Sequence, residues 1–182
     1  PVRSAIEQLA QVYQFDGVEQ DDLIYFRRRG GPAVATITRD ELGAGIDNAE
    51  AIAKAQTRAN ELGMPKRCYV AAPDPAMDYQ AGNQYAERLS RHAGEELSVQ
   101  TAAVLTADEA KRTALMLLYG TWASRWTLPV SLMRRYARLV PTDPIEVEGR
   151  RYRILSRLDD SGTYKLELAS DDRDTVNQTA QG

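Results

Sequence analysis

Hydrophobic residues along the 182-residue chain change repeatedly between helical and extended spacing. The first helical pattern covers residues 4–15, where Leu9 and Tyr13 share one face. Ser4 stands at the N-cap position and Glu7 three residues later, which is the spacing of a capping box. The pattern predicts a short amphipathic helix capped by Ser4.

Two runs rich in β-branched and aromatic residues follow, at 22–29 and 33–38. Glycines and a proline at 30–32 join them, and this arrangement predicts a β-hairpin. Residues 47–62 are compatible with a second helix, which a glycine and a proline then end. We therefore predict a helix-hairpin-helix module over residues 1–65.

The middle of the chain predicts two or three strands. Residues 66–72 form an extended apolar run, and further extended runs follow at 82–89 and 95–104. The first two runs are joined by the segment "PDPAMDYQ", in which two prolines and two aspartates are typical of a rigid turn.

The strongest local signal is a helix over residues 106–125. Thr106 and Glu109 form a capping box at its start. Its apolar face, read at helical spacing, consists of Ala110, Ala114, Leu117, Leu118 and Trp122.

After residue 125 the hydrophobic period changes to two. Trp126 and the apolar residues after it alternate with mostly small or polar ones, which predicts a strand, and Pro129 marks it as an edge strand or a bulged one. Extended runs at 144–149, 150–160 and 163–170 then predict a β-meander with glycine-containing turns.

These elements predict an α+β fold. The helix-hairpin-helix module of residues 1–65 is followed by a barrel-like antiparallel β module over residues 66–172, on which helix 106–125 packs. Residues 173–182 lack periodicity and are expected to be a flexible tail or linker.

Composition narrows the class of protein. The 23 basic and 26 acidic residues are mixed along the chain, so no basic tract suits nucleic-acid binding. No segment approaches the roughly 20 apolar residues of a membrane span, and we expect a soluble protein without a signal peptide. The start at Pro1, without a methionine, suggests a piece of a longer polypeptide.

Carboxylates are the first candidates for chemistry. Asp74 with Asp78, or Glu95 with Glu96, could serve a glycosidase, which needs two carboxylates across a sugar. Neither pair lies among the clustered aromatic residues that sugar-binding clefts usually contain. Residues 75–77 also lack the alternating oxygen ligands of a calcium loop. A structural turn explains Asp74 and Asp78 better.

The sequence gives little support for catalysis or metal binding by histidine and cysteine. His92 is the only histidine and Cys68 the only cysteine, so a catalytic triad, a Cys-His pair or a zinc site lacks the residues it needs. Cys68 lies in an apolar run and is interpreted as a small buried hydrophobic residue. We predict no catalytic, cofactor-binding or metal-binding residues.

Aromatic and basic residues have two interpretations each. Trp122 and Trp126 could stack a ligand, but such a pair more often packs a helix onto a sheet. The arginines of residues 27–29 could bind phosphate, but they are more typical of a solvated strand end, and they could also pair with acidic surfaces of a neighbouring subunit.

The order of the segments adds a family resemblance. "AIEQLAQVYQFDGVEQDDLIYFRRR", "YVAAPDPAMDYQAGNQYAER" and "LTADEAKRTALMLLYGTWASRWTLPVSLMRRYARLVPTDPIEVEGRRYRI" stand in an order that resembles the putative phage tail protein family. The shared patterns are F-x-x-R, D-x-x-x-D-Y-Q, T-A-D-E-A-x-R-x-A and G-x-x-Y-R-I, and they span roughly residues 3–172. The family usually has P-G-D-V-V where residues 141–145 are P-T-D-P-I, so the glycine is replaced by Thr142.

The resemblance implies a structural component of the tail tip or baseplate hub of long-tailed phages, prophages and gene transfer agents. Such hubs are expected to be rings, usually trimers, with the tail tube on one side and the tip or fibres on the other. It implies a place in the virion tail, assembly in the bacterial cytoplasm, and no catalytic role for Asp74, Asp78 or Tyr79. The alternatives are a receptor- or glycan-binding module and a carboxylate-dependent cell-wall hydrolase.

Overall fold

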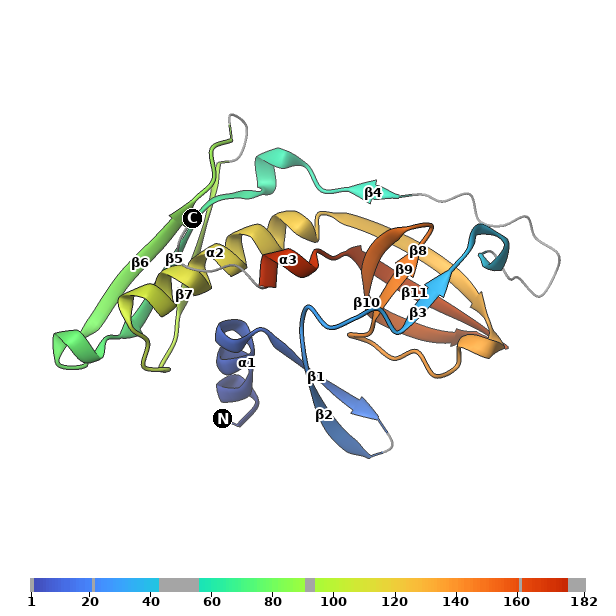
Figure 1. The fold of residues 1–182 in the computed structure, drawn as a ribbon, viewed down its shortest axis with the longest axis horizontal. Coiled ribbons are helices and arrows are strands. Elements are labelled where there is room, and N and C mark those ends of the chain that lie inside the picture. Colours follow the sequence, from blue (N-terminus) through green and yellow to red (C-terminus); the bar gives the residue numbers. More distant parts are fainter. Residues whose placement is uncertain (1, 21, 43–55, 91–93, 161, 177–182) are drawn as a thin grey trace. The chain divides into compact units, whose positions relative to one another are not determined.

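The structure is a computed structural model that describes residues 2–20, 22–42, 56–90, 94–160 and 162–176. These residues form a few helices and three sheets, which confirms the α+β class (Figure 1). No described helix has the length and apolar character needed to cross a membrane.

The chain divides into two compact units, and each unit is built from separated stretches of sequence. Unit 1 comprises residues 1–16, 59–122 and 173–182, and unit 2 comprises residues 17–58 and 123–172. The sequential modules 1–65 and 66–172 are a different division of the chain, and they stay a prediction.

Unit 1 consists of a three-stranded sheet and helices. Its elements are α1 (Val2–Tyr13), η2 (Glu61–Gly63), β5 (Pro65–Pro73), η3 (Pro75–Met77), β6 (Ala81–Glu87), β7 (Glu95–Gln100), α2 (Ala107–Ala123) and α3 (Arg173–Val176). The strand order is β6-β5-β7, with β5 antiparallel to β6 and parallel to β7. The strands and α2 expected between residues 66 and 125 are confirmed.

The core of unit 1 lies between the sheet and α2. Alternate residues of β5 (Cys68, Val70 and Ala72) are buried together with residues one helical turn apart on α2, such as Ala114 and Leu118. The alternation of the strand and the period of the helix therefore meet in one apolar layer, as the sequence predicts.

The capping box of α2 is formed as predicted. The Thr106 backbone N–H donates to Glu109 Oε2 at 2.9 Å, and the Glu109 N–H donates to Thr106 Oγ1 at 3.4 Å. The Thr106 hydroxyl also donates to Glu109 Oε2, at 2.9 Å. The backbone bond first, and then this hydroxyl bond, hold the pKa of Glu109 below its ordinary value of 4.5.

Glu109→Ala is expected to destabilise the chain at neutral pH by about 1 kcal/mol, because it removes the carboxylate from the cap. The pKa of Glu109 is lowered in the folded state. The carboxylate therefore stabilises the fold fully above pH 4.5 and less as pH falls through the lowered pKa. Urea denaturation of the parent and the variant between pH 7 and pH 3 should show their difference in stability narrowing.

Glu109→Gln is the matched control, because glutamine keeps the capping hydrogen bond without the titrating charge. An equal difference between parent and Glu109→Ala at every pH would contradict the role of the charge.

Unit 2 contains a six-stranded sheet and a separate two-stranded one. Its elements are β1 (Phe15–Gln20), β2 (Leu23–Arg28), β3 (Ala35–Ile37), η1 (Arg39–Glu41), β4 (Thr57–Arg58), β8 (Trp126–Met133), η4 (Arg134–Tyr136), β9 (Pro144–Val147), β10 (Arg150–Asp160) and β11 (Thr163–Ser170). The first two residues of β1 fall in unit 1. The large sheet has the order β3-β9-β10-β11-β8-β4, and its pairs are antiparallel except β3 with β9.

The predicted meander is β9, β10 and β11. Glu148 and Gly149 both have positive φ, at 49° and 73°, between the paired residues Val147 and Arg150. Two residues of positive φ make the tight turn whose twist suits a hairpin. Pro129 lies in the part of β8 that, among the described residues, is paired on one side only, as its position predicted.

The predicted hairpin between 22–29 and 33–38 is wrong. β2 pairs with β1, the strand before it, and β3 pairs in parallel with β9. Gly30 has φ 79°, so residues 30–32 do turn the chain, but they direct it to a different sheet. The sequence did not predict a strand at β1, because β1 contains a glycine and acidic residues, which are depleted in strands.

Three further expectations need correction. α1 begins at Val2, so Ser4 lies inside the helix instead of capping it. Of the predicted helix 47–62, residues 47–55 lie outside the described part of the chain, while Thr57–Arg58 form β4 and Glu61–Gly63 form η2. Of the predicted tail, residues 173–176 form α3 with Thr175 and Val176 buried.

The barrel-like closure is not found. The six-stranded sheet ends at β3 on one side and at β4 on the other, and these two strands do not pair with each other in the described chain. The sheet is therefore open.

Candidate functional site

The aspartate-rich loop is a capped turn. Asp74 is the N-cap of η3, and its Oδ1 accepts from the Ala76 N–H at 2.9 Å. Its backbone N–H donates to the Gln80 carbonyl at 3.0 Å, and its carbonyl accepts from the Tyr79 N–H at 2.9 Å. Asp74 is buried, which its place in a turn alone does not predict. Its carboxylate is used to hold the turn together.

Asp74→Ala is expected to cost about 1 kcal/mol of folding stability, because the Ala76 N–H loses its acceptor. Asp74→Asn keeps an oxygen at the same place and should retain most of that stability. Urea denaturation of both variants checks this. Equal losses for alanine and asparagine would contradict the capping role.

The other carboxylate pair is not arranged as a glycosidase pair either. Glu95 and Glu96 are successive residues of β7, so their side chains point to opposite faces of the strand. They cannot flank one sugar. Both are exposed. They lie at the start of β7, which is an edge strand of its sheet in the described chain.

Cys68 is fully buried, as expected, and burial raises the pKa of its thiol to about 11. His92 lies outside the described residues. Within the described part of the chain, no three His, Cys, Asp or Glu side chains are grouped so that they could hold a metal ion.

The two tryptophans do not form one pair. Trp122 is buried in the core of unit 1, where its Nε1–H donates to the Pro65 carbonyl at 2.8 Å and the Arg88 guanidinium lies 4.4 Å from the ring. Trp126 is half-buried at the start of β8 in unit 2, with Arg58 at 5.4 Å from its ring. The core role is confirmed for Trp122, and Trp126 is less buried than expected.

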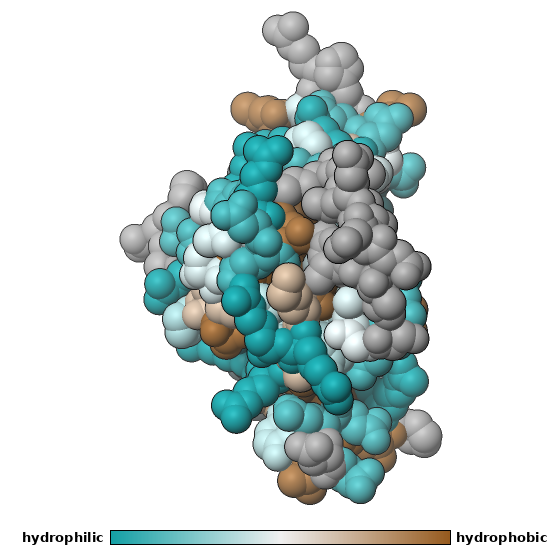
Figure 2. Space-filling model, turned by 90° about the vertical axis from the view of Figure 1, so that its right-hand side faces the viewer, coloured by the Kyte–Doolittle hydropathy of each residue, from teal (hydrophilic) through white to brown (hydrophobic). Residues whose placement is uncertain are grey.

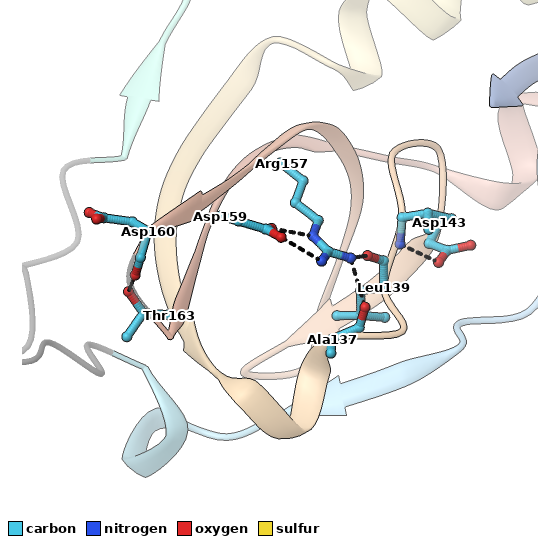
Figure 3. Close-up of polar contacts among 8 residues, drawn as sticks. Ala137, Leu139, Asp143, Arg157, Asp159, Asp160 and Thr163 are labelled. Atoms are coloured by element: carbon cyan, nitrogen blue, oxygen red, sulfur yellow. Dashed lines mark hydrogen bonds and ion pairs between the residues drawn. The ribbon is translucent and has the colours of Figure 1, made fainter. Parts of the chain in front are cut away.

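The β8–β9 connection is fixed by an arginine and an aspartate (Figure 3). Arg157 Nη1 donates to the carbonyls of Ala137 and Leu139, both at 2.7 Å, while its Nε donates to Asp159 at 2.9 Å. Asp143 Oδ2 accepts from the Val140 N–H at 2.9 Å. Charged side chains thus satisfy the backbone of a loop that has no regular partner.

Arg27, the first arginine of the run at residues 27–29, has a structural role. It forms an ion pair with Asp143, whose side chain is almost fully buried, so it fastens β2 to the loop before β9. Arg28, in contrast, is exposed. The first of these arginines is therefore structural, contrary to the expectation of a wholly solvated strand end.

Thr142 lies in the same loop with φ 78°, at the position where the resembling family has glycine. A β-branched residue is strained in the left-handed region, where glycine is not. The Thr142 hydroxyl is also buried and finds no hydrogen-bond partner among the described residues. Strand β9 nevertheless starts two residues later, at Pro144, so the missing glycine does not disturb it.

Thr142→Gly is expected to stabilise the chain by about 1 kcal/mol, because it removes left-handed strain and an unsatisfied hydroxyl. Thermal denaturation measures the gain. Thr142→Ala is the control: it removes the hydroxyl and keeps the strained Cβ. If glycine gained no more than alanine, the strain would not be the cause.

The most unusual surface feature is β2. Four consecutive large apolar residues, Leu23, Ile24, Tyr25 and Phe26, are 57%, 66%, 42% and 55% exposed. Figure 2 shows one face of the molecule, which is mainly hydrophilic with hydrophobic residues in small separate groups. Such scattered residues are normal, whereas four in succession on one strand call for a partner surface.

Sequence reasoning placed these residues in a strand but missed their exposure. The unbroken run "LIYF" was the available signal, because strands buried on both faces have continuous apolar sequences. We take β2 as the candidate interaction site of this chain.

Comparison with known proteins gives consistent matches. The sequence pattern of the family described as putative phage tail protein matches residues 1–157. No protein with a curated description is similar to the chain in sequence.

Three solved structures share the fold. A chain of the virion of a native gene transfer agent particle has a TM-score of 0.87 at 21% identity, over 99% of this chain and 41% of its own. A tail protein from Neisseria meningitidis MC58 has a TM-score of 0.58 at 13% identity, over 92% and 54%. The 43 kDa tail protein of prophage MuSo2 from Shewanella oneidensis has 0.58 at 11%, over 94% and 54%. This chain therefore spans about two fifths to about half of the chains it matches.

Proposed function

Because the chain belongs to the putative phage tail protein family, we propose that it is a structural segment of a tail-tip or baseplate hub, present in several copies around the tail axis. The observation that carries the proposal is β2, whose apolar residues are exposed in the single chain. In a permanent assembly such residues are covered by neighbouring subunits, because their burial contributes free energy to association.

An open strand edge supports the same proposal. In the described chain the six-residue strand β7 pairs with another strand on one side only. Soluble monomers normally protect or blunt such edges. In the ring, a neighbouring copy covers this edge.

We expect three copies in the ring, with tail tube proteins on one face and tip proteins on the other. The hub is expected to assemble in the bacterial cytoplasm and remain in the virion tail. Its contribution is shape and contact area, without a cofactor or a metal ion.

Quantitative mass spectrometry of purified tails tests this function. Peptides from this chain should be present at three copies per tail, counted against a tail protein of known copy number. A single copy per tail would contradict the ring.

The enzyme alternative has a direct test. A zymogram on peptidoglycan with Asp74→Asn and Asp78→Asn variants should show no lysis that depends on either residue, because the Asp74 carboxylate already caps η3. Lysis lost in either variant would overturn the structural role of this loop. A glycan pull-down tests the receptor-binding alternative, and specific retention of the chain would favour it.

A further inference from the structure

β2 has the sequence of an inner strand but the position of an outer one. Leu23 and Tyr25 point to one face, and Ile24 and Phe26 to the other, because side chains alternate along a strand. Both faces are therefore apolar and exposed. β1 occupies one edge of β2, and among the described residues no strand occupies the other.

An open, apolar edge is a template for another strand. The N–H and C=O groups along such an edge can hydrogen-bond to a partner backbone, and the side chains on both faces would then be flanked by those of the added strand. β2 contains no proline or inward-facing charge that would prevent this. The partner should therefore present an open strand of similar length.

β7 of the same chain is such a strand. It has six residues and pairs only with β5 in the described chain, so one of its edges is open. Its first residues, Glu95 and Glu96, form no ion pair with any described residue.

Other strand edges fit less well. On β6, Glu87 already pairs with Lys66 and Arg67, at 3.7 and 3.2 Å. On β8 the open edge is interrupted by Pro129, and β3 and β4 are only three and two residues long.

We propose that β2 of one copy of this chain adds antiparallel to the open edge of β7 of a second copy. The pairing places Arg28 opposite Glu95, which joins two exposed charges of opposite sign. Phe26 then lies opposite Leu97. Arg28, like the two glutamates, has no ion-pair partner among the described residues.

The faces of the two strands agree in this register. Leu97 and Val99 align with the buried Cys68 and Val70 of β5, and both are half-buried at the edge of the sheet. Phe26 and Ile24 would lie beside them and extend this apolar layer past the edge. Tyr25 would face Ser98 on the outer side, next to Tyr69.

A parallel arrangement does not match. It would place Leu23 opposite Glu95 and Arg27 opposite Val99, so an apolar residue would meet a charge near each end. The charges and the apolar pairs agree only in the antiparallel direction.

The contact joins two different surfaces and is therefore head-to-tail. Repeated around an axis, such a contact closes into a ring when the rotation allows it. The inference rests on the proposed hub function and names the interface that would build the ring.

Charge reversal tests the contact in the full chain. Arg28→Glu and Glu95→Arg should each weaken self-association by about tenfold or more, since like charges then face each other. The double variant should associate nearly as tightly as the parent. Analytical ultracentrifugation measures the dissociation constants, and circular dichroism confirms that each variant is folded. Failure of the double variant to recover would overturn the proposal.

Disulfide trapping tests the register. Copies carrying Tyr25→Cys are mixed with copies carrying Ser98→Cys, and oxidation should yield a covalent dimer, because directly opposed strand residues lie within disulfide reach. Cys68 does not compete, since its thiol is buried. Tyr25→Cys mixed with Asn83→Cys, on β6, is the matched control and should remain monomeric on a denaturing gel.

The outcomes separate this interface from the proposed function. Trapping through the β6 cysteine, or no trapping while purified tails still contain three copies, would overturn the β2–β7 contact and leave the hub function standing. A single copy per tail would contradict the hub function itself.

Discussion

Replacing Trp122 with alanine is expected to lower the free energy of unfolding by about 3–5 kcal/mol. The indole is only 7% exposed, and its loss leaves a cavity between α2 and the three-stranded sheet. It also removes the hydrogen bond to the Pro65 carbonyl. The loss is a large share of the roughly 5–15 kcal/mol that stabilises a domain, so the melting temperature should fall sharply.

Trp126→Ala is the matched control, because it removes the same side chain from a half-buried position. Its cost should be clearly smaller, and urea denaturation measures both. If Trp122→Ala melted like the parent but no longer bound the neighbouring tail proteins, the indole would be a recognition surface instead of a core residue.

Asp143→Ala should cost about 1.5–3 kcal/mol, the second largest effect. The aspartate is 3% exposed, and its two oxygens serve the Arg27 guanidinium and the Val140 N–H. Alanine leaves that N–H, at a buried position, without its acceptor, and it frees β2 from the loop before β9. Thermal and urea denaturation measure the cost.

Asp159→Ala is the control for Asp143. Asp159 also pairs with an arginine, at 2.9 Å from Arg157, but its side chain is 66% exposed. Exposed ion pairs contribute little, so this variant should lose about 1 kcal/mol or less. Equal losses at the two positions would show that burial does not determine the role of Asp143.

Local sequence signals predicted which residues form helices and strands better than they predicted which strands pair with each other. The capping box at Thr106 and the alternation that starts at Trp126 are complete within one element, so α2 and β8 are where the sequence placed them. The pairing of β3 with β9 joins residues more than a hundred positions apart, and nothing in residues 33–38 specifies that partner. A turn at 30–32 suggested the nearest strand instead.

The candidate site, too, was predicted from the sequence only in part. The β-branched and aromatic residues of the run predicted a strand at Leu23–Phe26. Whether a strand is covered depends on what packs against it, and for β2 that partner is expected in another molecule. The burial of Asp74 was missed for a related reason. Turn chemistry predicted its capping bond, while its burial arises from the three-dimensional packing around the turn.

A cryo-EM reconstruction of isolated tails tests the proposed ring. We predict three copies of this chain around the tail axis, with β2 of each copy covered by a neighbouring protein. A single copy, or a peripheral position in which the residues Leu23–Phe26 remain exposed to solvent, would contradict it.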